Sequence, residues 1–135
     1  MNGTVKRIYM ALLSGVVMGW GFAAFLAFSA DASRVPSPHD VRFIELLSAV
    51  HAVGASVLLS ASVLTGRFLK SGDQTSYVIR GALAEGAAML GVMTGLLAAG
   101  MHVLPSHPIF WLNALSAGGM ALVLGLNLPK DERLP

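Results

Sequence analysis

Four long apolar runs dominate this sequence and limit the folds that are open to it. They cover residues 8–28, 44–65, 77–101 and 109–126. A helix needs roughly 20 residues to cross the roughly 30 Å of hydrocarbon in a bilayer, and each run is about that long. Because lipid offers backbone groups no hydrogen-bond partner, segments that enter it must fold as helices. We therefore expect an all-α integral membrane protein that forms one domain over residues 1–135.

Composition agrees with this class, since 55% of the residues are hydrophobic and only 12% are charged. The connections left between the runs are short, which makes successive helices antiparallel in an up-down-up-down four-helix bundle. Asp40 stands where it could cap the second helix. The expected helices cover residues 7–29, 42–67, 77–102 and 108–127.

Lysine and arginine are distributed unevenly over the connections. Of the nine, only Arg34 and Arg42 fall on one side of the expected bundle. Basic residues that flank short loops are retained in the cytoplasm, so both termini are expected there, in a bacterial inner membrane. The net charge of +2 reflects the same bias and gives no argument for a nucleic-acid partner. The other seven are Lys6, Arg7, Arg67, Lys70, Arg80, Lys130 and Arg133.

The first run has an alternative interpretation as a signal peptide. Lys6 and Arg7 precede it, and Ala30-Asp31-Ala32 resembles a cleavage site of small residues. The apolar run is longer than a usual signal core, which favours a retained span over processing of residues 1–32. The absence of cysteine excludes disulfides and thiolate chemistry.

Small residues recur at spacings of three or four along every expected helix, where they let helix backbones approach closely in lipid. Two outcomes stay open. A tight bundle uses all of these faces internally, or one face serves a partner subunit or a second copy. The residues that we assign to helix packing are Gly15, Gly19, Ser56, Gly81, Ala84, Ala88, Gly91 and Gly95.

Glu85 lies within the third run, five residues after Arg80. Ionisable groups inside membrane helices are costly and are functional candidates by default. Its neighbours Ala84 and Ala88 suggest that it faces protein, where burial would suit a proton or ion carrier. Alternatively Arg80, or Arg67 and Lys70 of the adjacent connection, neutralises it in a structural ion pair. We favour the ion pair because Glu85 is close to the end of the run.

Two further polar residues, Glu45 and His51, lie in the second run. Glu45 follows Arg42 by three residues, which favours a surface ion pair on one helix face. His51 and His102 are candidate axial haem ligands, and Glu45 could join histidines around a metal ion. No His-x-x-x-His spacing occurs, so we expect no cofactor and keep haem as an alternative.

The segment from the second to the third run, residues 42–102, includes the string ALAEGAAMLGVMTGLL and resembles the proteolipid c subunit of rotary ATP synthases. The resemblance covers less than half of the chain and implies that Glu85 is a proton carrier. Over its whole length the sequence is similar to small uncharacterised four-span membrane proteins of bacteria.

No nucleophile paired with a base, no phosphate-binding loop and no soluble domain can be found in the sequence. We therefore expect a non-enzymatic protein that acts as a structural or accessory subunit of a membrane complex or homo-oligomer. Proton or ion translocation through Glu85 is the first alternative. Binding of haem or a metal on the outer side is the second.

Overall fold

The computed structural model of this chain describes residues 2–69 and 73–128, and all regular secondary structure in this part is helical. This confirms the expected all-α class. The helices are α1 (Asn2–Ser29), α2 (Pro38–Phe68), α3 (Gln74–Gly100), α4 (Val103–Ser106), the 3₁₀ helix η1 (Pro108–Ala114) and α5 (Leu115–Asn127).

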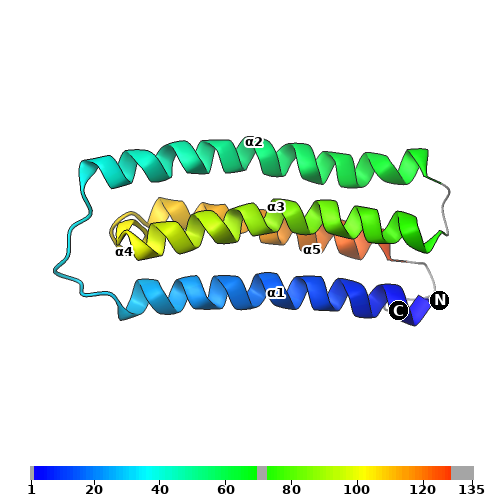
Figure 1. The fold of residues 1–135 in the computed structure, drawn as a ribbon, viewed down its shortest axis with the longest axis horizontal. Helices are drawn as coiled ribbons and strands as arrows, with labels where there is room; N and C mark the ends of the chain where they lie inside the picture. The colour runs from blue at the N-terminus through cyan, green and yellow to red at the C-terminus, as the bar shows by residue number, and fades with distance from the viewer. Residues whose placement is uncertain (1, 70–72, 129–135) are drawn as a thin grey trace.

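Successive long helices run in opposite directions, and α3 is the centre of the bundle (Figure 1). It packs against α1, α2 and α5, whereas α1 and α2 lie on opposite sides of it. Helices α1 and α3 therefore run in the same direction although they are neighbours. The start of α1, the end of α2, the start of α3 and the end of α5 share one end of the bundle (Figure 1).

Four helices of the described chain are long and apolar enough to cross a membrane, the fourth being η1 together with α5. Their outward surfaces are apolar, since large side chains such as Met18, Phe25 and Leu46 are more than 60% exposed. A water-soluble protein rarely leaves this much apolar surface uncovered. The helices thus have the length, composition and apolar outer surface that suit an integral membrane protein.

Local sequence explains where α2 and α3 begin. Ser37 is the N-cap of α2, with its hydroxyl accepting the N–H of Asp40 at 3.1 Å, and Pro38 follows in the first turn, where its missing N–H has no cost. Asp40 therefore lies in the first turn and is not the cap. Asp73 caps α3 by accepting the N–H of Thr75 at 3.2 Å.

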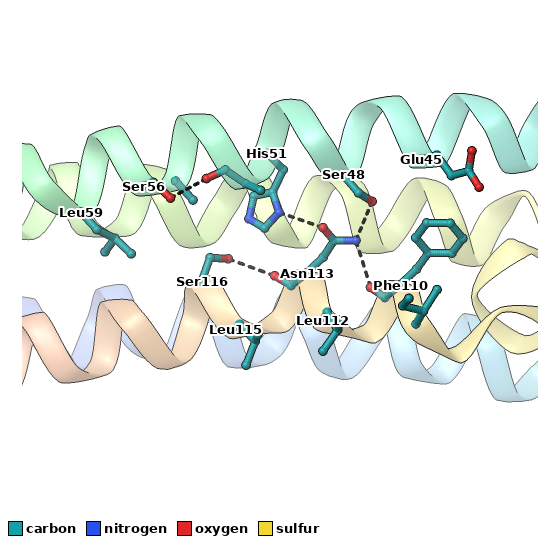
Figure 2. Close-up of a pocket in the computed structure, with 13 residues that line it drawn as sticks. Glu45, Ser48, His51, Ser56, Leu59, Phe110, Leu112, Asn113, Leu115 and Ser116 are labelled. Carbon is teal, nitrogen blue, oxygen red and sulfur yellow. Dashed lines mark hydrogen bonds between the residues drawn. The ribbon is translucent and has the colours of Figure 1, made fainter.

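The fourth run is divided between a 3₁₀ and an α segment, where the sequence predicted one helix. Pro108 starts η1, and the α-helical pattern begins only at Leu115. A 3₁₀ stretch of this length is uncommon because its hydrogen-bond geometry is poorer than that of an α-helix. Asn113, within this 3₁₀ stretch, points its side chain towards α2 (Figure 2).

Candidate functional site

A groove of about 570 Å³ opens between α2 and the η1–α5 segment (Figure 2). We call it the α2–α5 groove. One wall carries the polar side chains of α2, and the other is largely apolar. The α2 wall includes Glu45, Ser48, His51 and Ser56, and the facing wall includes Ile109, Leu112 and Leu115.

A hydrogen-bonded group that joins α2 to η1 lies beside this groove. The Nδ1 atom of His51 lies 2.8 Å from Oδ1 of Asn113. The amide nitrogen of Asn113 donates to the hydroxyl of Ser48 and to the carbonyl of Phe110, both at 2.9 Å. Both His51 and Asn113 are buried, so these bonds satisfy polar groups that would otherwise be stranded in an apolar interior.

The hydrogen bonds of Asn113 determine which ring nitrogen of neutral His51 carries the hydrogen. A carbonyl can only accept, so the Asn113 amide nitrogen must face Phe110, and its Oδ1 faces His51. The hydrogen on neutral His51 therefore lies on Nδ1, where it is donated to Asn113. Nε2 carries the lone pair, and this buried atom has no hydrogen-bond partner within residues 2–69 and 73–128.

Gly91 of α3 allows this group to pack deep in the bundle. A Cβ at position 91 would lie 2.5 Å from the carbonyl oxygen of Asn113 and 3.0 Å from Nε2 of His51, and would also meet the hydroxyl of Ser116. Ser116 in turn donates to the carbonyl of Asn113 at 3.0 Å. Glycine is thus required where α2 and α5 approach the α3 backbone together.

Glu45 lines the α2–α5 groove near the start of α2, and it is exposed. The expected ion pair with Arg42 is not formed. Within the described part of the chain, the only ion pair joins His39 to Asp40, which lie 3.9 Å apart. The carboxylate of Glu45 is consequently free at this end of the groove.

Arg80 reaches away from Glu85. Its guanidinium donates to the side-chain oxygen of Asn127 on α5 and to the carbonyl of Ser62 on α2, the latter at 3.4 Å. Ser62 returns a hydrogen bond to the carbonyl of Arg80 at 2.7 Å. The guanidinium passes over Gly66, where any Cβ would collide with it. Arg80 therefore ties three helices together.

Glu85 is half-buried beside the fully buried Ala84 and Ala88. Its carboxylate forms no hydrogen bond or ion pair with any residue that the structure describes. The predicted pair with Arg80 is therefore wrong, because Asn127 and Ser62 already hold the guanidinium. Lys70, another expected partner, lies outside the described residues.

The small residues of α3 are used inside the bundle. Gly81 packs beneath the ring of Tyr9, and Gly95 packs beneath Trp20, so both admit aromatic side chains of α1. Gly19 of α1 in turn admits a side chain of α3, because Val92 packs over it. Ala84 and Ala88 are part of the apolar core.

Other small residues face outward. Gly15 of α1 has open space where a Cβ would stand, and Ala11 beside it is exposed. Ala23 and Ala27 of the same helix are buried. A four-residue spacing drifts by about 40° per step around a helix of 3.6 residues per turn, so these residues cannot share one face. Ser56 of α2 is exposed and lines the α2–α5 groove.

His102 lies at the end of α3 in the left-handed conformation, with φ of 60°. It lines cavities beside the 30–37 connection, whereas His51 lines the α2–α5 groove. The structure thus places the two candidate haem ligands in different cavities. Among residues 2–69 and 73–128, no group of three or more histidine, cysteine or acidic side chains has an arrangement that could hold a metal ion.

Two asparagines, Asn113 and Asn127, are central to these networks and were not predicted as site residues. Each is a polar residue within or at the end of the fourth apolar run. Side-chain amides inside a membrane helix hydrogen-bond to neighbouring helices, so this was the signal that could have identified them. Their partners on α2 and α3 could not be read from the sequence.

No protein-family model, curated protein or solved structure matches this chain. The resemblance of residues 42–102 to the proteolipid c subunit therefore stays a prediction, and function must be argued from the geometry.

Proposed function

We propose that this chain is a non-enzymatic accessory subunit of a membrane protein complex, and that it docks a transmembrane helix against the outward face of α1. The observation that carries this proposal is the position of Gly15. It has open space above it, and Ala11 lies exposed one turn before it. By contrast, the glycines at 81, 91 and 95 of α3 are occupied by side chains of the chain itself.

The chemistry of helix association in lipid supports this choice of face. Apolar side chains gain little by leaving lipid for a protein surface, so association depends on close backbone approach over small residues. Ser14, which is also exposed, satisfies its hydroxyl within α1 by donating to the carbonyl of Ala11 at 2.8 Å. Ala11, Ser14 and Gly15 thus form a small exposed patch without unmet hydrogen bonds, which suits close approach by a partner helix.

The test compares Gly15→Leu with Gly118→Leu. Both glycines are exposed helical residues with nothing within 4 Å of a Cβ, so neither substitution should disturb the bundle. After purification in mild detergent, wild-type protein and Gly118→Leu should give a complex heavier than the 14.1 kDa chain. Gly15→Leu should give the chain alone. Equal masses for all three proteins would exclude docking on this face.

We infer that both termini face the cytoplasm, as basic residues do in bacterial inner-membrane proteins. The start of α1, the end of α2 and the start of α3 share one end of the bundle (Figure 1). The described basic residues in these segments are Lys6, Arg7, Arg67 and Arg80. Arg34 and Arg42 lie towards the other end.

The absence of cysteine makes this orientation easy to test. Ser33→Cys and Gln74→Cys each add a single thiol at opposite ends of the bundle. In intact cells, a membrane-impermeant maleimide should label the cysteine at 33 and leave that at 74 unlabelled until the membrane is opened. The reverse pattern would invert the orientation.

Proton or ion translocation through Glu85 is a second candidate function, and one specific observation favours it. The carboxylate is half-buried in a membrane span and has no partner in the described chain, since Arg80 is held elsewhere. Such groups mark proton pathways in other membrane proteins.

Proton flux into vesicles that contain the purified protein tests this candidate. Glu85→Gln should abolish the flux, whereas Glu45→Gln, which removes an exposed carboxylate near the other end of the bundle, should not change it. If Glu85→Gln conducts like the wild type, or if neither exceeds protein-free vesicles, the candidate is excluded.

A further inference from the structure

We propose that the α2–α5 groove binds one chain of a membrane lipid whose headgroup is a neutral hydroxyl. The site combines a long apolar cavity with free hydrogen-bonding groups at one end. This inference is independent of the docking face on α1 and of Glu85.

The size of the groove fits a hydrocarbon chain. It extends along α2 from Glu45 to Leu59, and at 1.5 Å per residue these fourteen steps are about 21 Å. Dividing about 570 Å³ by that length gives a mean cross-section of about 27 Å². A helix about 10 Å across needs roughly 80 Å², so a partner helix could not lie wholly inside the groove.

The walls have the chemistry that a lipid chain requires. Leu112 and Leu115 are large, apolar and more than half exposed on one side of the groove, and the small side chains of Ala52 and Ala55 line it on α2. The hydroxyl of Ser56 is satisfied within α2, because it donates to the carbonyl of Ala52 at 2.7 Å. Hydrocarbon can therefore pass this serine without breaking a hydrogen bond.

Free polar groups are concentrated at the end near Glu45. The carboxylate of Glu45 has no partner in the described chain and can accept hydrogen bonds. Ser48 accepts the amide of Asn113, and no described residue accepts the hydrogen of its own hydroxyl, so Ser48 can donate. The two residues are one helical turn apart on the same face, with Cβ atoms about 5–6 Å apart.

A hydroxyl headgroup uses both groups at once. It donates its hydrogen to Glu45 and accepts the hydrogen of Ser48 on its oxygen. An anionic phosphate or carboxylate would be repelled by Glu45, and an ammonium group cannot accept from Ser48. A neutral alcohol meets both requirements with a single oxygen atom.

Binding can be measured with the full chain in mild detergent by native mass spectrometry, with three probes of equal chain length. These are a monoacylglycerol, the corresponding fatty acid and its methyl ester. The wild type should retain one monoacylglycerol about tenfold more strongly than the methyl ester, which is the effect of about one net hydrogen bond. Glu45→Gln and Ser48→Ala should each reduce this preference for the monoacylglycerol.

Two matched substitutions on α2 test the location. Ser56→Phe fills the groove, whereas Ser60→Phe adds the same ring one turn later, on an exposed position outside it. Ser56→Phe should lose the bound lipid and Ser60→Phe should keep it. If Ser56→Phe does not fold, Ala52→Leu is the second groove-filling variant. The proposal would be overturned if Ser56→Phe and Ser60→Phe retained the lipid equally. It would also be overturned if the wild type did not prefer the monoacylglycerol to the methyl ester.

Discussion

The Nδ1 atom of His51 lies 2.8 Å from Oδ1 of Asn113, which is 62 residues further along the chain. This contact holds His51, which is the buried histidine of α2. It joins two helices that the sequence separates by the whole of α3. The same asparagine holds Ser48 and the carbonyl of Phe110, so one side chain fixes η1 against α2.

Asn113→Ala should therefore loosen the contact between α2 and η1. It leaves the Nδ1 hydrogen of His51 without an acceptor, and we expect a loss of about 1–3 kcal/mol in the free energy of unfolding. A double-mutant cycle with His51→Ala, measured by unfolding in mixed detergent micelles, should give a coupling of about 0.5–2 kcal/mol. Strictly additive effects would contradict the hydrogen bond.

Gly91→Ala should destabilise the bundle because its new methyl group meets the backbone oxygen of Asn113, which cannot move without shifting η1. Overpacking of this kind costs about 1–3 kcal/mol. The control is Gly118→Ala, a helical glycine with open space, which should leave thermal stability unchanged or slightly higher. Similar melting temperatures for the two variants would show that η1 does not approach the α3 backbone closely at position 91.

Arg80→Met should lower stability by about 1–3 kcal/mol, since the side-chain oxygen of Asn127 and the carbonyl of Ser62 lose their charged donor. Arg67→Met removes the same charge at the same end of the bundle from an exposed side chain, and should have little effect. Chemical unfolding in detergent compares the two. Equal losses would mean that charge, and not the hydrogen bonds of Arg80, is responsible.

Asp31, in the connection between α1 and α2, should titrate below its usual range. The backbone N–H and the hydroxyl of Ser33 both donate to its carboxylate, which lowers the pKa of Asp31. Because the folded pKa is the lower one, the contribution to stability is complete above the unfolded value, about 3.9, and is lost as pH falls through the folded value. NMR titration should show the pKa of Asp31 rising in Ser33→Ala, which keeps only the backbone donor.

The all-α class of this protein was predictable from the sequence, because each apolar run specifies its own helix without reference to the rest of the chain. The four apolar runs are helices because their length and composition leave no other structure in lipid, and the bounds of α2 and α3 lie within a few residues of those expected. Small residues at Gly81 and Gly95 were predicted to admit close neighbours, and they lie beneath Tyr9 and Trp20.

The sequence determined by itself that the chain forms long apolar helices, because apolar length and hydrogen-bonding need are properties of each segment alone. Only the tertiary structure decided which polar groups meet. Arg80 lies five residues from Glu85 but reaches Asn127, and His51 pairs with Asn113, because α3 packs between α1 and α2 and brings α5 against them. Such partners depend on helix order and rotation, which spacing along one helix does not reveal.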